Sequence, residues 1–308
     1  MSRVLVLTGP TGVGKTRVAV ALGRLAPIEV VSADSRQLYR YLNIGTAKPT
    51  PEERAAVPHH GLDLVPPTER YSAGRFAAKA RPWIAEIGAR GNMPVVVGGT
   101  GLYLRALFDG LFAEPPLDPE RRERLRAALA RLGRAGLERW AARLDSGFEA
   151  AGAPGQRAAR AVEMALLTGR PLSEWRRAAP PPPSGLEPWY AVLALPRGAL
   201  AERIAARARA MVAAGLVDEV RRLLAAGVPR GAPGLDAVGY REAVAVVEGR
   251  LPEGALADAI AAATRRYARR QETWLRHQLR APAAQFDAAD SPEALARAVL
   301  SGYRAADP

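Results

Sequence analysis

The fold of this chain follows from one stretch near its start, Val4-Leu5-Val6-Leu7-Thr8-Gly9-Pro10-Thr11-Gly12-Val13-Gly14-Lys15-Thr16. Its first four residues form an apolar run typical of a buried strand, and Val18-Ala19-Val20-Ala21-Leu22 after it predict a helix. Between them lies G-x-x-x-x-G-K-T, the glycine-rich P-loop. In such a loop backbone N–H groups surround a diphosphate, the lysine adds a point charge, and the threonine hydroxyl can hold Mg²⁺. The sequence therefore predicts a phosphate-binding α/β fold.

Asp34 and Thr100 are predicted to lie beside this loop, at the ends of two further strands. A short strand over 29–32 runs into Ala33-Asp34-Ser35, and the apolar run 94–97 continues into Gly98-Gly99-Thr100-Gly101. Apolar runs without alternation favour a parallel sheet with helices on both faces. Because ligands of such sheets bind at the carboxyl ends of the strands, we expect the P-loop, Asp34 and Thr100 to meet at one site.

The local sequence leaves the roles of both residues open. Asp34 suits a general base or an outer Mg²⁺ ligand, and equally a helix N-cap or turn residue. Thr100 supplies a hydroxyl to a ligand or belongs to a plain glycine turn. The strand that ends at Val97 lacks the acidic residue that P-loop NTPases place there for Mg²⁺, which weakens a nucleotide-hydrolysing interpretation. His59-His60, adjacent on a strand and without a third ligand nearby, indicate a structural pair rather than a metal site.

The middle of the chain changes character. Between 115 and 183 helices rich in Arg, Glu, Leu and Ala follow one another without a strand, over 121–132, 137–144 and 156–168. The prolines at 180–183 make a stiff return segment, after which a strand is predicted at 190–195. We therefore expect a P-loop NTPase-like core, a parallel sheet flanked by helices, formed by 1–114 and 184–308. An all-helical domain, 115–183, is inserted into it.

Two long helices are predicted in the C-terminal part of the chain. Residues 200–226 form an amphipathic helix, and residues 253–280 form a basic one. The basic helix carries arginines with interleaved aromatic side chains: Arg265, Arg266, Tyr267, Arg269, Arg270, Trp274, Arg276 and Arg280. Such a pattern is typical of a phosphate-binding face, and also fits an Arg-rich surface helix with Trp274 buried. The segment 236–241, with glycine, tyrosine and arginine before another helix, could contact a nucleotide.

The composition points to a polyanionic partner. The 308-residue chain carries 44 Lys and Arg against 31 Asp and Glu, a net charge of +13 at pH 7. Such an excess favours a nucleic acid over a membrane surface, with compositional drift in an Arg- and Ala-rich chain as the alternative. No cysteine is present, which excludes disulfides and thiolate metal sites. No apolar run approaches the length of a membrane span, so we expect a cytoplasmic protein.

Taken in order, the motifs of the chain resemble those of the tRNA dimethylallyltransferases, the isopentenyl-pyrophosphate transferase family. The resemblance spans nearly the whole chain and rests on the series rather than on any one motif. Its elements are 9–16, Ser32-Ala33-Asp34-Ser35 with Gln37 and Tyr39, 44–49, Pro58-His59-His60, Tyr71-Ser72, 97–103, Gln156-Arg157 with Arg160-Ala161, 238–241, and Arg270-Gln271 with Thr273-Trp274.

The resemblance implies transfer of a dimethylallyl group from dimethylallyl diphosphate to the N6 amine of adenosine 37 in tRNA. The P-loop would then bind a diphosphate that leaves, with Mg²⁺ on Thr16. Catalysis is implied for Asp34, Thr100, Lys15 and Arg207. Diphosphate binding is implied for Gly9, Pro10, Thr11, Gly12, Val13, Gly14, Lys15, Thr16 and Arg207. Contacts to the anticodon stem-loop of tRNA are implied for Asp34, Ser35, Arg36, Gln37, Thr100, Arg122, Gln156, Arg157, Arg160, Gly239, Tyr240, Arg241, Arg269, Arg270, Gln271, Thr273, Trp274 and Arg276.

Two other classes of function compete with this one. A P-loop kinase of a small metabolite follows from 9–16 alone but needs neither the basic final helix nor the insertion. A non-enzymatic RNA-binding protein with a degenerate P-loop accounts for the charge. A monomer that wraps around tRNA is the simplest expectation for the assembly.

Overall fold

The computed structural model describes residues 2–112, 114–149, 155–181, 183–279 and 283–306. It divides the chain into two compact units, Met1–Asp109 with Ser184–Pro308, and Gly110–Pro183. The sequence placed the first boundary at Pro115, a few residues later than the structure does. Arg280 and Pro182 lie outside the described residues. In the part of the chain that is described, no helix combines the length and the apolar character needed to cross a membrane.

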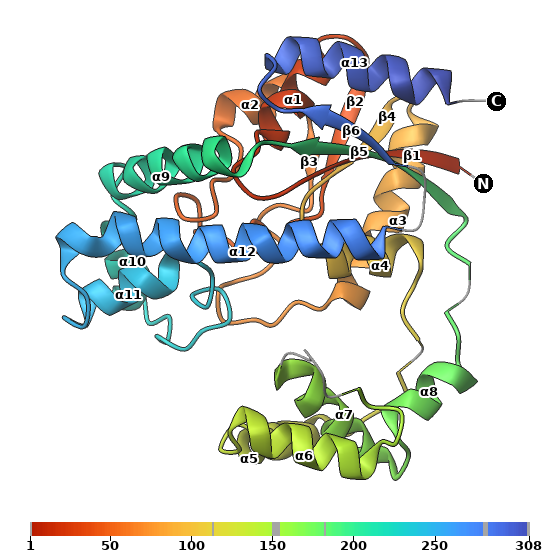
Figure 1. Cartoon of the computed structure of the whole chain (residues 1–308), viewed down its shortest axis with the longest axis vertical. Coiled ribbons are helices and arrows are strands. Elements are labelled where there is room, and N and C mark those ends of the chain that lie inside the picture. The colour runs from red at the N-terminus through yellow and green to blue at the C-terminus, as the bar shows by residue number, and fades with distance from the viewer. Residues whose placement is uncertain (1, 113, 150–154, 182, 280–282, 307–308) are drawn as a thin grey trace. The chain divides into compact units, whose positions relative to one another are not determined.

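A six-stranded parallel sheet forms the centre of the larger unit (Figure 1). Its strands lie in the order β3-β2-β4-β1-β5-β6, and every neighbouring pair is parallel. Residues 4–7 of the central strand β1 are completely buried, as their unbroken apolar run predicts. The strands are β1 (Ser2–Thr8), β2 (Ile28–Ser32), β3 (His59–His60), β4 (Met93–Val97), β5 (Leu186–Ala194) and β6 (Ala283–Asp287).

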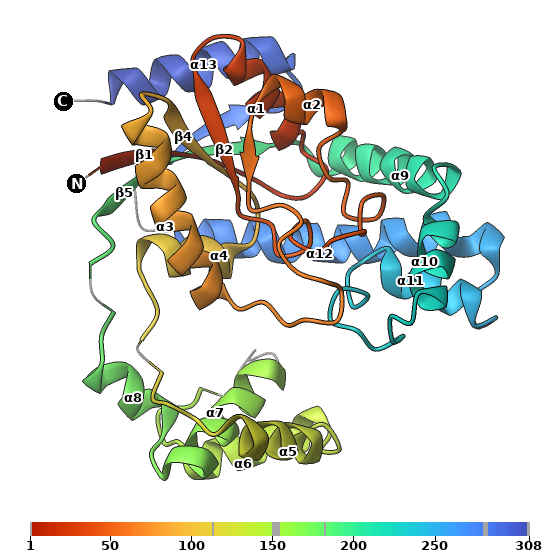
Figure 2. The same cartoon turned by 180° about the vertical axis from the view of Figure 1, so that it is seen from behind.

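Helices cover both faces of this sheet (Figures 1 and 2). The helices α1 (Lys15–Gly23) and α13 (Pro292–Ala305) pack together on one face, and α3 (Ala73–Ala89) and α4 (Gly101–Phe108) pack together on the other. The short helix α2 (Pro51–Ala56) begins at Thr50 with a capping box. This layering is the predicted doubly covered α/β core.

Four helices of the C-terminal part extend the core beyond the carboxyl ends of the strands. They are α9 (Arg197–Ala213), α10 (Leu216–Ala225), α11 (Tyr240–Val247) and α12 (Leu256–Gln278), the last preceded by a 3₁₀ turn, Glu253–Ala255. The prediction of one helix over 200–226 is wrong, because Gly215 adopts φ 87° and ends α9 before α10 begins. The long helix α12 packs along α9 and contacts α11 and α4.

The smaller unit consists of helices α5 (Pro119–Leu129), α6 (Arg134–Leu144), α7 (Gly155–Thr168) and α8 (Leu172–Ala178). Asp118 caps α5 as expected, since its carboxylate accepts hydrogen bonds from the N–H groups of Glu120 and Arg121. The unit has an apolar core of its own, in which Ala141, Val162 and Met164 are completely buried. The insertion is therefore all-helical where it is described, as the sequence predicted.

Candidate functional site

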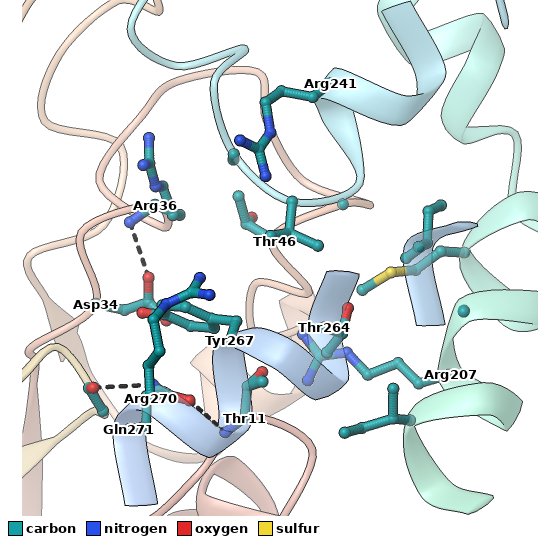
Figure 3. A pocket seen from close by; sticks show the side chains of 18 of the residues that line it. Thr11, Asp34, Arg36, Thr46, Arg207, Arg241, Thr264, Tyr267, Arg270 and Gln271 are labelled. Carbon is teal, nitrogen blue, oxygen red and sulfur yellow. Dashed lines mark hydrogen bonds between the residues drawn. The ribbon is translucent and has the colours of Figure 1, made fainter. Parts of the chain in front are cut away.

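The P-loop, the end of β2 and the C-terminal helices line one cavity (Figure 3). Thr11 and Lys15 come from the loop, Asp34 follows β2, and Gly99 follows β4. Helices α9 and α12 form an opposite wall that includes Ile204, Met211, Ile260 and other apolar side chains. Five cations face two carboxylates in the lining: Lys15, Arg36, Arg207, Arg241 and Arg270 against Asp34 and Asp236. The cavity is thus built for an anionic ligand that also has an apolar part.

The P-loop keeps its shape through glycine conformations and through Lys15. Gly9 adopts φ 143°, and a Cβ there would lie 2.4 Å from the carbonyl oxygen of Leu193, so only glycine fits beside β5. The Lys15 ammonium donates hydrogen bonds to the carbonyl oxygens of Gly9 and Pro10 at 3.0 and 2.9 Å. Burial lowers the pKa of Lys15 to about 8, which the Asp34 carboxylate opposes and the Arg207 guanidinium reinforces.

Helix α9 places two arginines against the loop. Arg207 lines the cavity, and burial lowers the pKa of its guanidinium, an effect that Asp34 opposes. Arg203 lies one turn earlier and donates hydrogen bonds to the carbonyl oxygens of Val13 at 3.3 Å and Ala288 at 2.9 Å. Arg203 was not among the residues predicted to form the site. Its i, i+4 spacing from Arg207 was the available signal, because residues at that spacing share a helix face.

Asp34 is a turn residue that also lines the cavity. Its Oδ1 accepts hydrogen bonds from the backbone N–H of Arg36 at 2.8 Å and of Gln37 at 3.4 Å, which makes it a turn residue. The same carboxyl group lines the cavity together with Lys15 and with Arg207 (Figure 3). The turn therefore holds a carboxylate at a fixed place inside a positively charged cavity.

Thr100 links the ends of β2 and β4. Its hydroxyl oxygen accepts a hydrogen bond from the backbone N–H of Ser35 at 3.1 Å and donates to the Ser35 hydroxyl at 3.4 Å. It is also hydrogen-bonded to the phenol of Tyr267, a cavity-lining residue whose pKa is raised mainly by burial. Gly99, rather than Thr100, is the residue of this turn that lines the cavity. The predicted convergence of the strand ends is present, with Thr100 just behind the cavity wall.

Tyr240 corrects one prediction. Its side chain is completely buried, so a direct contact with tRNA is excluded. Its hydroxyl donates a hydrogen bond to Glu219 at 2.5 Å and accepts one from the backbone N–H of Gly45 at 3.1 Å. Burial and the adjacent Glu219 carboxylate raise the pKa of Tyr240 well above its usual range. The preceding Gly239 adopts φ 97° and donates its N–H to Glu242, so this turn shapes the entry to α11.

The side chains of Gln37, Gln271 and Trp274 also have hydrogen-bond or packing partners within the protein. The Gln37 amide donates to the carbonyl oxygens of Thr46 and Ala47 and accepts from the Ser32 hydroxyl. The Gln271 amide bonds to the P-loop and to Gly99. The Trp274 ring lies on Gly101, where a Cβ would come within 2.2 Å of it. The motif identified these positions, and the structure gives each side chain partners within the protein. Their predicted tRNA contacts stay predictions.

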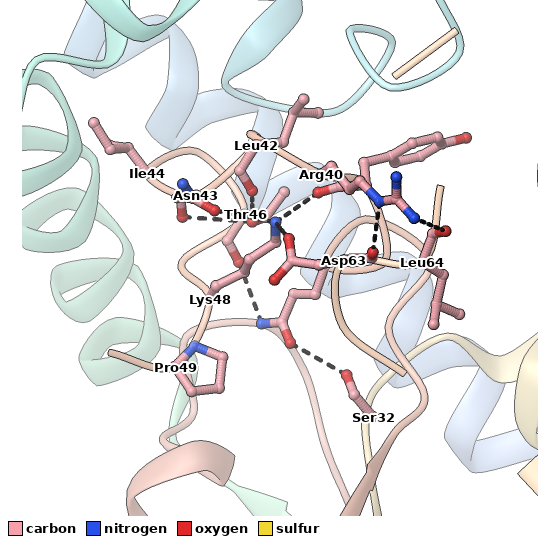
Figure 4. A network of polar contacts seen from close by, with 12 residues as sticks. Ser32, Arg40, Leu42, Asn43, Ile44, Thr46, Lys48, Pro49, Asp63 and Leu64 are labelled. Carbon is pink, nitrogen blue, oxygen red and sulfur yellow. Dashed lines mark hydrogen bonds and ion pairs between the residues drawn. The ribbon is translucent and has the colours of Figure 1, made fainter. Parts of the chain in front are cut away.

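The buried Lys48 supports the loop that carries Thr46 (Figure 4). Lys48 donates hydrogen bonds to the carbonyl oxygen of Tyr39 at 2.5 Å and the Asn43 side chain at 3.1 Å. It also forms an ion pair with Asp63 at 2.5 Å. Burial lowers the pKa of Lys48 although Asp63 opposes the shift. The contacts fix this loop, and with it one wall of the cavity.

The exposed arginines of α12 form the basic face that the sequence predicted. Arg269, Arg270 and Arg276 are exposed, and Arg270 lines the cavity with its guanidinium 5.6 Å from the centre of the Tyr267 ring. The Thr273 hydroxyl donates to the carbonyl oxygen of Arg269, so its bond stays within the helix. Arg241 lines the cavity and pairs with Asp236 at 3.6 Å.

In the inserted unit, the predicted tRNA-binding residues divide into two groups. Arg122 and Arg160 pair with Glu163 and with Glu114, and Arg126 pairs with Glu163 as well. Burial alone would raise the pKa of Glu163, but these guanidinium groups hold it below its usual value. Gln156 and Arg157, at the start of α7, are exposed. The ion cluster organises the unit, and the α7 residues present polar groups to solvent.

The site offers few protein ligands for a metal ion. Thr16, in the first turn of α1, carries a hydroxyl beside the P-loop. Among the described residues no group of three or more His, Cys, Asp or Glu side chains could hold a metal, and His59 and His60 instead bond to the Val57 carbonyl and to Glu29. This donor set fits Mg²⁺ bound mostly by phosphate oxygens and water.

Comparison with known proteins gives a consistent result. The IPP transferase family model matches residues 37–278, and an isopentenyl transferase model matches residues 2–59. The chain is 45% identical to a tRNA dimethylallyltransferase of Methylibium petroleiphilum, covering 98% of this chain and 94% of that one. It is 47% identical to a tRNA dimethylallyltransferase of Anaeromyxobacter dehalogenans, covering 96% and 99% of the two chains. The crystal structure of a tRNA isopentenylpyrophosphate transferase from Bacillus halodurans superposes with a TM-score of 0.71 at 31% identity, covering 98% and 97%.

Proposed function

The chain belongs to the IPP transferase family and is a tRNA-prenylating enzyme, and from this premise we propose how its cavity performs the reaction. The P-loop binds dimethylallyl diphosphate, and the acceptor is the N6 amine of adenosine 37 in the anticodon loop of tRNA. The observation that carries the proposal is that Lys15, Arg207 and Asp34 line one cavity. Diphosphate-binding cations and a carboxylate are the groups that this reaction needs.

The leaving group sets the first requirement. The bond between C1 of the dimethylallyl group and the bridging oxygen breaks, and its electron pair remains on the diphosphate. Lys15, Arg207 and the N–H groups of the P-loop stabilise this charge in a water-poor site, where such interactions are strongest. Mg²⁺ on Thr16 and the diphosphate oxygens would supply further charge neutralisation.

The nucleophile sets the second requirement. The N6 lone pair of adenine is conjugated with the ring, so the amine is weak and depends on positioning. The new bond forms between N6 and C1, and the Asp34 carboxylate accepts the proton that N6 loses. Arg36 and Gln37 fix Asp34 through their backbone N–H groups, which keeps its oxygen directed into the cavity. The adenine must leave its stack to reach Asp34, at a lower cost in a single-stranded loop than in a duplex.

The tRNA backbone is proposed to contact the exposed cations of the larger unit. Arg269, Arg270 and Arg276 of α12 and Arg241 of α11 are exposed. Arg157 and Gln156 of the insertion are proposed to add further contacts. The net charge of +13 supports association with a polyanion of this size. A monomeric state and a cytoplasmic location belong to the same proposal, and size-exclusion chromatography with cell fractionation checks them.

The function is tested by incubating the protein with labelled dimethylallyl diphosphate, Mg²⁺ and unmodified tRNA that has adenosines at positions 36 and 37. We expect label on adenosine 37 and release of diphosphate. Substitution of adenosine 37 should abolish transfer. Turnover of ATP with a small acceptor and no prenyl transfer would instead establish the kinase, and tRNA binding without either reaction would establish a binding module.

The role of Asp34 is tested by Asp34→Asn, because the amide oxygen can still accept the Arg36 N–H bond and preserve the turn. We expect turnover to fall by about 10²-fold or more, with the tRNA dissociation constant within about threefold of wild type. Asp236→Asn removes the other carboxylate of the cavity and should cost far less turnover. Comparable losses in the two variants would argue against a proton-accepting role for Asp34.

A further inference from the structure

Gln271 of α12 bridges the two loops that border the phosphate cradle. Its Oε1 accepts a hydrogen bond from the backbone N–H of Thr11 at 2.8 Å, and its Nε2 donates one to the carbonyl oxygen of Gly99 at 2.8 Å (Figure 3). The side chain is 8% exposed and lines the cavity. A Cβ at Gly99 would lie 2.4 Å from Nε2, so this turn admits the amide only because it has no side chain.

The bridge changes what the P-loop can offer a ligand. A P-loop binds phosphate with its backbone N–H groups. The Thr11 N–H is already used by Gln271, and the Gly9 and Pro10 carbonyl oxygens accept from Lys15. The early part of the loop therefore presents amide and carbonyl oxygens. The later part leads into the N-terminus of α1, where the first helical turn presents N–H groups and a positive helix dipole. An anion is favoured at one end and opposed at the other.

We propose that Gln271 limits the cradle to a diphosphate and excludes a third phosphate. In a P-loop the lysine reaches the last two phosphates of a triphosphate. The Lys15 ammonium lies on the carbonyl oxygens of Gly9 and Pro10 at the start of the loop, so a terminal phosphate would lie on that side. Here that side holds Oε1 of Gln271 and the carbonyl oxygens of Gly9 and Pro10. A terminal phosphate would face these oxygens and would break the Thr11 bond. The inference rests on the proposed binding of dimethylallyl diphosphate and explains how a loop of the ATP-binding type would select it.

The wild-type protein gives the first test, by titration calorimetry with inorganic diphosphate and inorganic tripolyphosphate at one free Mg²⁺ concentration. Charge alone favours tripolyphosphate, so a preference for diphosphate has to come from the shape and donors of the cradle. We expect diphosphate to bind about tenfold tighter than tripolyphosphate, or more. This factor corresponds to the loss of the Thr11–Gln271 hydrogen bond and to the Gln271 oxygen left facing the terminal phosphate of tripolyphosphate.

Gln271→Ala should bring the two dissociation constants within about threefold of each other, chiefly through tighter tripolyphosphate binding. Gln271→Met retains the length of the side chain without its amide, and should shift the ratio in the same direction if the alanine variant does not fold. Gln278→Ala is the matched control, since Gln278 is an exposed glutamine on the same helix, and it should keep the wild-type ratio.

The outcomes separate the two proposals. Wild-type protein that binds neither anion contradicts the proposed diphosphate site itself. Wild-type protein that binds both with equal affinity leaves that site standing and overturns the role of Gln271. A folded Gln271 variant that retains the wild-type preference for diphosphate overturns it as well.

Discussion

The buried contact between Tyr240 and Glu219 should control the loop that forms one wall of the cavity. Glu219 accepts hydrogen bonds from the backbone N–H groups of Asn43 and Ile44, each at 3.2 Å, and from the Tyr240 hydroxyl. The Tyr240 hydroxyl in turn accepts the N–H of Gly45. Tyr240→Phe removes one oxygen and preserves the ring, so it perturbs the hydrogen bonds without creating a large void.

Its cost follows from the groups left behind. The Gly45 N–H loses its acceptor in a buried place, at about 1–3 kcal/mol. Glu219 loses a hydrogen bond to a carboxylate, worth about 1.5–3 kcal/mol. We therefore expect Tyr240→Phe to lower the free energy of opening this loop by about 3 kcal/mol. A double-mutant cycle with Glu219→Gln should give a coupling energy of about 1–2 kcal/mol, since the two groups share one bond.

The assay is amide hydrogen exchange at residues 43–45, which reports the opening of this loop directly. Urea unfolding followed by circular dichroism shows how much of the effect is global. Tyr41→Phe is the matched control, because Tyr41 is 65% exposed and lies in the same segment. A neutral surface substitution changes stability by about 0.5 kcal/mol or less. If the opening free energy of Tyr240→Phe differs from that of wild type by no more than this, the reasoning is refuted.

Three further predictions address charge and packing. Because burial lowers the pKa of Lys15 to about 8, its charge is lost as pH rises through that value, and diphosphate affinity should fall by up to about tenfold per pH unit above it. Calorimetry of Lys15→Arg, which stays charged, should show no such fall beyond the titration of diphosphate itself. Arg270→Ala should weaken tRNA binding and reduce the slope of log affinity against log salt concentration by about 1. The control Arg304→Ala, on α13, should leave the slope unchanged. If both variants have the slope of wild type, α12 has a structural role only. Gly101→Ala places a Cβ 2.2 Å from the Trp274 ring. It should lower the unfolding midpoint by an amount equivalent to about 2 kcal/mol. A midpoint equal to that of wild type would show that the ring moves aside without cost.

Local signals were sufficient to predict much of the fold. The P-loop with its flanking strand and helix, the strand ending at Val97 and the helical insertion each have a pattern that is complete within a few residues. A weakly patterned element was missed, since β6 consists of Ala283–Asp287 without a hydrophobic run. The strand expected at His59-His60 is present as β3. The start of α13 did carry a signal, since Ser291 caps it and Pro292 occupies its first turn.

Within the site, prediction succeeded where a general rule of sheet geometry applied. Parallel strands bring their carboxyl ends to one edge, so Asp34 was correctly placed beside Lys15. Prediction failed where a side chain had two possible destinations. A tyrosine next to an arginine is compatible with an RNA contact and with a core position. The tertiary structure buries Tyr240, whose hydroxyl bonds to Glu219.

The sequence by itself determined that this chain carries a P-loop cradle at the edge of a parallel sheet, since a strand, a glycine loop and a helix are local structures. The tertiary structure alone decided what surrounds the cradle. Thr11 and Gln271 are 260 positions apart, and Val13 and Arg203 are 190 apart. Contacts over such separations depend on how α9 and α12 pack across the strand ends, and no pattern within either helix specifies which backbone group its polar side chains will meet.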